Sequence, residues 1–102
     1  MHSRAPSAAT LILLGVLASQ PEADRYGYEL IKSTGLASGT LYPILMRLHD
    51  RGLLTAKWRP SPEPGRPPRH AYRLTKAGAE YAATALSKQA QFKRLVAKKA
   101  SA

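Results

Sequence analysis

One short stretch of the chain, residues 36–52, carries hydroxyl and guanidinium side chains that are suited to nucleic acids. Thr40 and Tyr42 supply hydroxyl groups, and Arg47 supplies a guanidinium group. These groups bond the phosphates and the base edges of nucleic acids. The stretch is therefore predicted to contact DNA, with the rest of the chain holding and aiming it.

The same stretch has the apolar spacing of an amphipathic helix. Its apolar residues recur at intervals of one, three or four: Leu41, Ile44, Leu45 and Leu48. That spacing places them on one helical face and leaves the polar residues on the other. Small polar residues such as Ser38 are suited to capping the start, and Gly52 is suited to end the helix in a left-handed conformation. We therefore expect a DNA-recognition helix here.

Pro43 complicates the first turn of this helix. Proline lacks a backbone N–H, which is harmless only in the first helical turn. If Thr40 caps the helix, Pro43 falls inside that turn, whereas a cap at Ser38 places it just beyond. The sequence leaves both alternatives open. In either case the free N–H groups of the first turn are suited to face a phosphate.

The composition of the 102 residues limits the class of protein. A formal net charge of +10 indicates a polyanionic partner, either nucleic acid or an anionic membrane surface. The chain has no cysteine, which excludes disulfides and thiolate zinc sites and fits a cytoplasmic protein. Its length is that of one domain, small enough that dimerisation would add usefully to the buried surface.

Patterns typical of catalysis are missing from the sequence. The histidines are scattered, and the adjacent His49 and Asp50 point apart on a helix. We find no paired carboxylates, glycine-rich phosphate loop or nucleophile arrangement. We therefore expect no enzyme activity, no metal and no cofactor.

An apolar run over residues 8–18 looks like the core of a signal peptide, but it is too short to cross a bilayer, which takes about 20 apolar residues. We expect instead a helix over residues 7–19, capped by Ser7. Apolar residues surround this helix, so we expect one side to pack on its own domain. The other side, with Leu11 and Leu14, is expected to pack on a second subunit.

A second helix is predicted over residues 25–34, with Asp24 as its cap and Gly35 as its end. Its candidates for burial are Tyr28, Leu30 and Ile31. Gly27 in the first turn is unfavourable by roughly 1 kcal/mol relative to alanine unless a close approach requires it. The link to the next helix, residues 35–37, is very short, which predicts a helix-turn-helix.

Two strands and a loop are predicted after the recognition helix. Polar and apolar residues alternate over residues 54–59 and 69–74, the period of two of a strand. The intervening residues 60–68 are rich in proline and form a loop. Trp58 and Tyr72 are assigned to packing rather than to DNA contact.

The hairpin is strongly basic. Residues 56–75 contain five cationic residues and one acidic residue, a net charge of +4. Arg66 and Arg69 are expected to reach the minor groove or the phosphates beside it. A stiff basic hairpin that follows a helix-turn-helix predicts a winged helix.

The last helix is predicted over residues 76–100, with Thr75 as its cap. A broken apolar stripe runs along it, and no later element covers this stripe: Ala77, Tyr81, Ala85, Leu86, Phe92, Leu95 and Val96. A second subunit would cover it, and a free, partly frayed helix is the alternative. The dimerisation residues expected here are Tyr81, Leu86, Phe92 and Leu95.

The predicted fold class is mainly α with a small β-hairpin. Residues 7–75 are expected to form a winged helix-turn-helix DNA-binding domain. Residues 76–100 are expected to form an added C-terminal dimerisation helix that packs on the same domain.

Several motifs resemble those of the PadR family of bacterial transcriptional regulators. They are Tyr26-Gly27-Tyr28-Glu29-Leu30, Ser38-Gly39-Thr40-Leu41-Tyr42-Pro43, Gly65-Arg66-Pro67 and Tyr72-Arg73-Leu74-Thr75. The resemblance implies a winged-helix homodimer that binds a palindromic promoter site, usually as a repressor. It also implies that the first and last helices form the dimer surface. With a single helix after the wing, the chain resembles the short members of the family.

The residues expected to contact DNA lie in three segments: Tyr26, then Ser38, Gly39, Thr40, Tyr42, Pro43 and Arg47, then Arg66 and Arg69. For Ser38 a capping role is equally compatible, and for Tyr26 a place in the core. The expected partners are double-stranded DNA and a second copy of the chain, with no membrane. The sequence leaves open a small-molecule effector, and also a second function as a protein-binding or anionic-surface module without sequence-specific DNA binding.

Overall fold

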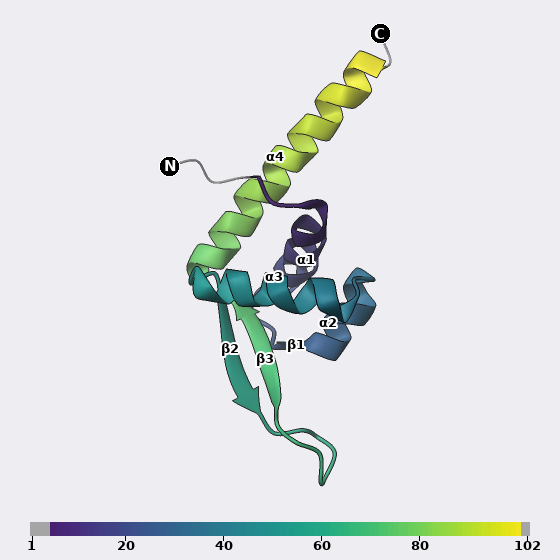
Figure 1. Ribbon diagram of the computed structural model, residues 1–102. Helices are drawn as coiled ribbons and strands as arrows, with labels where there is room; N and C mark the ends of the chain where they lie inside the picture. Colours follow the sequence, from purple (N-terminus) through teal and green to yellow (C-terminus); the bar gives the residue numbers. More distant parts are fainter. Residues whose placement is uncertain (1–4, 101–102) are drawn as a thin grey trace.

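The computed structural model describes residues 5–100, which form four helices and a three-stranded antiparallel sheet. The elements follow in the order α1 (Ala8–Ser19), β1 (Arg25–Tyr26), α2 (Gly27–Thr34), α3 (Ser38–Asp50), β2 (Leu54–Arg59), β3 (Arg69–Leu74) and α4 (Lys76–Ala100). The hairpin of β2 and β3 extends from one end of the helical core, and α4 extends from the opposite end (Figure 1). The protein is therefore elongated, with principal extents of 60 × 29 × 24 Å. The predicted fold class is confirmed.

Helix α1 begins where the sequence predicts. The Ser7 hydroxyl accepts a hydrogen bond from the Thr10 backbone N–H at 3.1 Å, which caps the helix. Leu13, Leu14 and Leu17 are buried in the core. Among the described residues, none of the helices combines the length and the hydropathy needed to cross a membrane.

The segment before α2 differs from the prediction. Arg25 and Tyr26 do not begin the helix, but form the short strand β1, which pairs with Tyr72 and Ala71 of β3. Strand β3 has an edge whose backbone groups need partners, and pairing with it replaces one helical turn. Helix α2 consequently starts at Gly27 with Tyr26 as its cap residue, and the predicted cap at Asp24 is wrong.

The end of α2 agrees with the prediction, but one of its buried residues does not. Gly35 adopts a left-handed conformation, with φ of +72°, and its N–H donates to the Ile31 carbonyl at 2.9 Å. Tyr28 was expected to be buried and is 70% exposed. It lies two positions from the buried Leu30, which places the two side chains on different faces of the helix.

Helix α3 begins earlier than either predicted alternative. Its cap residue is Ala37, and the Leu41 N–H donates to the Ala37 carbonyl at 2.9 Å. Neither Ser38 nor Thr40 is the cap. Pro43 therefore lies inside the helix and supplies no helical donor to the Gly39 carbonyl. Both residues are exposed, so solvent or a ligand can satisfy this carbonyl.

The end of α3 is a left-handed glycine cap, as predicted. Gly52 has φ of +75°, and its N–H donates to the His49 carbonyl at 2.9 Å. The Leu53 N–H donates to the Leu48 carbonyl, also at 2.9 Å. These two bonds satisfy carbonyls that the helix leaves free and turn the chain sharply into β2.

The two strands of the hairpin have the predicted bounds, and they pair from Leu54 opposite Leu74 to Arg59 opposite Arg69. The inner end of the hairpin packs on α3 as part of the core, but the hairpin extends beyond that helix. The predicted packing of Trp58 is therefore wrong, because it is 66% exposed. Its ring stacks on the neighbouring His70, with ring centroids 3.8 Å apart.

Helix α4 is tied to the end of α3 through Thr75. The Thr75 hydroxyl accepts from the Gly78 N–H at 3.0 Å, as the predicted cap requires, and donates to the Gly52 carbonyl at 2.8 Å. Gly78 packs so closely that an added Cβ would overlap the Leu53 carbonyl oxygen. This close approach sets the position of α4, which then packs along α1.

Replacing Gly78 by alanine should lower the free energy of unfolding by about 2 kcal/mol, because the new methyl group collides with backbone that cannot move aside. Gly15→Ala is the matched control. A Cβ at Gly15 meets only Leu86 Cδ2, at 4.0 Å, so this change should raise stability by about 0.5–1 kcal/mol through helix propensity. Urea unfolding of both variants measures the difference, and equal stabilities would contradict the close packing.

Candidate nucleic-acid interface

One face of α3 is exposed to solvent. The predicted contact residues Ser38, Gly39, Thr40, Pro43 and Arg47 are all exposed on it. The opposite face is buried through the four apolar residues of its core stripe. The helix thus presents small polar groups near its N-terminus and one cation further along.

Tyr42 belongs to this face but leans toward α2. An added Cβ at Gly27 would overlap the Tyr42 hydroxyl and lie 2.8 Å from the ring atoms Cε1 and Cζ. The glycine at the start of α2 is therefore required by a close approach, the condition under which the sequence could tolerate it. Tyr42 remains 40% exposed, so it both packs on α2 and faces solvent.

Two arginines of the hairpin are held by Asp24. The Asp24 carboxylate accepts from Arg73 Nη2 at 2.9 Å and lies 3.4 Å from Arg59 Nε. Asp24 thus joins the α1–β1 loop to both β2 and β3. Sequence reasoning missed this role, because residues far apart in the chain meet only through the pairing of β1 with β3.

The two predicted wing contacts are exposed, and each has one neighbour within the protein. The Arg69 guanidinium lies over the half-buried ring of Tyr26, 3.5 Å from the ring centroid. Arg66 pairs with Glu63 in the loop, at 3.1 Å. Exposed pairs of this kind contribute only about 0–1 kcal/mol, so a phosphate can replace the partner at little cost.

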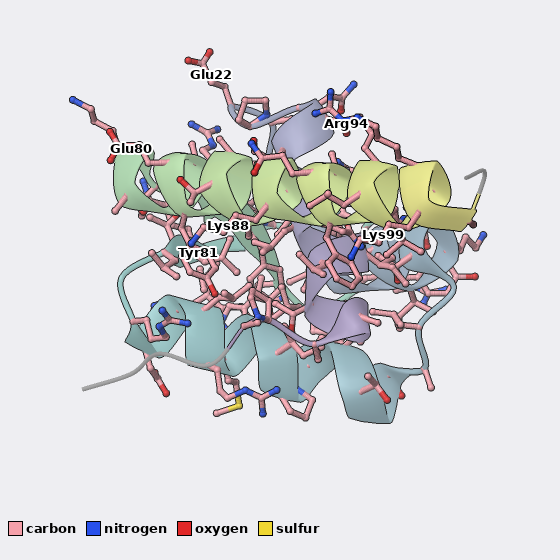
Figure 2. All side chains as sticks on the ribbon, turned by 90° about the horizontal axis from the view of Figure 1, so that it is seen from above. Glu22, Glu80, Tyr81, Lys88, Arg94 and Lys99 are labelled. Atoms are coloured by element: carbon pink, nitrogen blue, oxygen red, sulfur yellow. The ribbon has the colours of Figure 1, made fainter. Side chains whose placement is uncertain are left out.

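Most arginines in the described part of the chain have such a partner, and only Arg47 and Arg94 have neither an ion pair nor a ring contact. Arg47 is on the exposed face of α3. Arg94 is on α4, on the other side of that helix from Tyr81 (Figure 2). Among the arginines of residues 5–100, the two without such a partner are therefore one on the predicted recognition helix and one far along α4.

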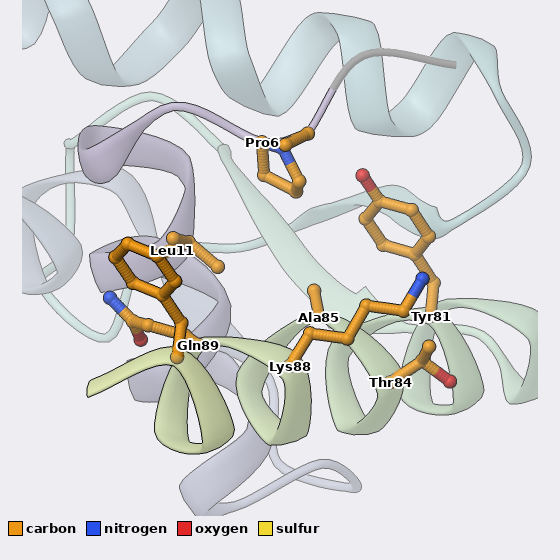
Figure 3. A pocket seen from close by; sticks show the side chains of 9 residues that line it. Pro6, Leu11, Tyr81, Thr84, Ala85, Lys88 and Gln89 are labelled. Atoms are coloured by element: carbon orange, nitrogen blue, oxygen red, sulfur yellow. The ribbon is translucent and has the colours of Figure 1, made fainter. Parts of the chain in front are cut away.

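The predicted dimerisation residues differ in what they expose. Phe92 and Leu95 are well exposed on α4, whereas Leu11, Tyr81 and Leu86 are half-buried. Leu14 is fully buried in the core of this subunit, so in this structure it offers no surface to another subunit. A cavity of about 440 Å³ lies between the segment before α1, α1 itself and α4 (Figure 3).

Comparison with known proteins decides the family. The model of the transcriptional regulator PadR-like family matches residues 13–84, which covers the helix-turn-helix, the hairpin and the first part of α4. The chain belongs to the PadR-like family of transcriptional regulators. Its role is therefore regulation of transcription through DNA, and it is not an enzyme. No curated protein matches the chain.

Solved structures of PadR regulators share this architecture. A PadR family regulator from Eggerthella lenta is 30% identical, with a TM-score of 0.73 over 85% of this chain and 79% of that chain. One from Clostridium difficile is 22% identical, with a TM-score of 0.76 over 90% of this chain and 97% of that chain. The regulator MepR from Staphylococcus aureus shares the fold at 15% identity, with a TM-score of 0.68 over 91% of this chain and 64% of that chain.

For this PadR-like protein, Arg47→Ala should weaken DNA binding and make the slope of log affinity against log salt shallower by about 1 if Arg47 pairs with a phosphate. Arg94→Ala removes the same charge from the far end of α4 and should leave the slope unchanged. Fluorescence anisotropy of a labelled duplex at several salt concentrations measures both. If the two variants have the same DNA affinity and the same salt slope, Arg47 does not contact the DNA.

Asp24→Asn should raise the affinity for random-sequence duplex, because it releases Arg59 and Arg73 to bind phosphates. Asp50→Asn is the control, since it removes the same charge but frees no arginine. At low salt, the increase in affinity for random duplex should be several-fold larger for Asp24→Asn than for Asp50→Asn. Equal gains would mean that only the net charge matters and that Asp24 does not restrain the wing.

Proposed function

We propose that this chain acts in the cytoplasm as a homodimeric repressor that binds a palindromic operator. Each subunit would place the exposed face of α3 in the major groove and the basic hairpin at the adjacent minor groove or its phosphates. The observation that supports this most is the exposed face of α3, where hydroxyl groups and the unpaired Arg47 are gathered beside a basic wing. The roles of the individual contact residues are part of this proposal.

The exposed apolar side chains near the end of α4 support dimerisation. This helix has 25 residues and extends past the core, where Phe92 is 68% exposed and Leu95 is 58% exposed. Large apolar side chains exposed together on one helix favour a protein partner. A second copy that pairs through α4 and the outer side of α1 would cover them together with Leu11, Tyr81 and Leu86.

The twofold symmetry of such a dimer is the reason for proposing a palindromic operator, and its binding over a promoter is the reason for proposing repression. Two identical subunits related by a twofold axis read two inverted half-sites. Bound over a promoter, the dimer would keep RNA polymerase from the same DNA. The cavity between α1 and α4 opens beside the proposed dimer surface, so it is the candidate place for a small-molecule effector.

Selection of bound sequences from random duplex tests this function. The wild-type chain should enrich an inverted repeat whose half-sites are about 10–10.5 base pairs apart from centre to centre, or a multiple of this. Phe92→Asp should sediment as a monomer. The sequences that this variant selects should contain a single half-site instead of the inverted repeat. Gln91→Asp adds the same charge at the neighbouring position and should keep both wild-type properties.

A reporter promoter that carries the selected repeat should then be repressed by the wild-type chain and much less by Phe92→Asp. Selection without any enriched sequence would contradict sequence-specific binding. Enrichment of a single half-site by a wild-type monomer would contradict the dimer while leaving DNA binding in place.

A further inference from the structure

A second feature of the interface is a pocket of about 280 Å³ between the start of α2, α3 and β3. Its walls include Gly27, Tyr42, Arg69 and Tyr72. The pocket is open to solvent beside the exposed face of α3, since Tyr42 is partly exposed and Arg69 is exposed. Its lining is largely aromatic, carries the cation of Arg69 on one side, and adjoins the helix that is proposed to read DNA.

Tyr72 is the unexplained group in this pocket. It is only 8% exposed, yet no atom among residues 5–100 forms a hydrogen bond with its hydroxyl. No side-chain oxygen or nitrogen in residues 5–100 is both buried and unpaired, so the Tyr72 hydroxyl is accessible from the pocket that Tyr72 lines. A hydroxyl that is accessible and has no partner within the protein can donate to a group outside it. Burial raises the pKa of the Tyr72 phenol and the nearby Tyr42 adds to this shift, which keeps the hydroxyl protonated as a donor.

The start of α2 offers further donors at the same place. Its cap residue, Tyr26, makes no side-chain capping bond, so the first backbone N–H groups of the helix are not capped by it. The acidic residue of this turn, Glu29, is already paired with Arg25. A helix start with free N–H groups favours an anion, and the Arg69 guanidinium adds a full positive charge.

We propose that this pocket binds one phosphate of the DNA backbone and that Tyr72 is a further DNA-binding residue. The inference rests on the proposed function, because the phosphate belongs to the duplex that α3 reads. The hydroxyls of Tyr72 and Tyr42 donate hydrogen bonds to the phosphate oxygens. The Arg69 guanidinium turns from the Tyr26 ring to pair with the negative charge of the phosphate. Gly27 leaves room for this arrangement, since an added Cβ would overlap the Tyr42 hydroxyl that lines the pocket.

The test combines Tyr72→Phe with duplexes that each carry a single uncharged methylphosphonate. The duplex is the sequence that the wild-type chain selects, and random duplex is compared with it. Tyr72→Phe should weaken binding to both by about tenfold, the expected effect of losing a hydrogen bond to a charged group. Its midpoint of unfolding should stay the same or rise, because the hydroxyl has no partner within the protein.

The position of the coupling identifies the phosphate. In the wild type, a methylphosphonate at each contacted phosphate weakens binding. In Tyr72→Phe, a methylphosphonate at one phosphate of each half-site should reduce the binding affinity clearly less than it does in the wild type. Methylphosphonates at the other contacted phosphates should reduce the affinity as much as they do in the wild type. Ser87→Ala removes an exposed hydroxyl from α4 and should show the wild-type pattern at every position.

Several results would overturn the proposal. If the affinity losses caused by Tyr72→Phe and by a methylphosphonate add fully at every phosphate, Tyr72 contacts none of these phosphates. A lower midpoint of unfolding with unchanged binding would make its hydroxyl structural. Inorganic phosphate that shifts the Tyr72 ring resonances, without coupling in the duplex, would assign the pocket to a free anion. A wild-type chain that binds neither duplex would instead refute the proposed function itself.

Discussion

The close approach of Tyr42 to Gly27 is the contact on which the DNA-facing side of the protein depends. It brings the N-terminal half of α3 against the start of α2, at a distance that leaves no room for a side chain on the glycine. The same contact forms one wall of the pocket that contains the Tyr72 hydroxyl. A single glycine therefore allows the close approach of the two helices and forms part of the wall of the proposed phosphate site.

The inner end of the wing packs in the core through Leu54 and Leu74, whereas its outer half is held by strand pairing and by contacts between charged groups. The outer half extends beyond the core, so few apolar contacts can hold it. Asp24 instead binds one arginine from each strand of the hairpin, and Tyr26 lies under Arg69. Arg69, a proposed DNA contact, is thus ordered beforehand by the Tyr26 ring, which reduces the entropy lost on binding, whereas Asp24 keeps Arg59 and Arg73 from binding phosphates.

Features that depend on neighbours in sequence were predictable, and those that depend on distant residues were not. Caps such as Ser7 and Thr75 and the left-handed end at Gly52 follow from local chemistry, and the structure has all three. Strand β1 was missed because it exists only beside β3. The role of Asp24 was missed for the same reason. Most predicted DNA contacts are exposed as expected, whereas the place of Tyr72 required the pocket to be seen.

Mapping the DNA-bound surface by amide chemical shifts tests the central claim most directly. Isotope-labelled protein is titrated with its selected duplex, and the shift of each backbone N–H is followed. We predict that the largest changes lie in the first half of α3, the start of α2 and the basic hairpin, with little change from direct contact at the end of α4. Changes confined to the basic end of α4, with α3 unaffected, would contradict the account.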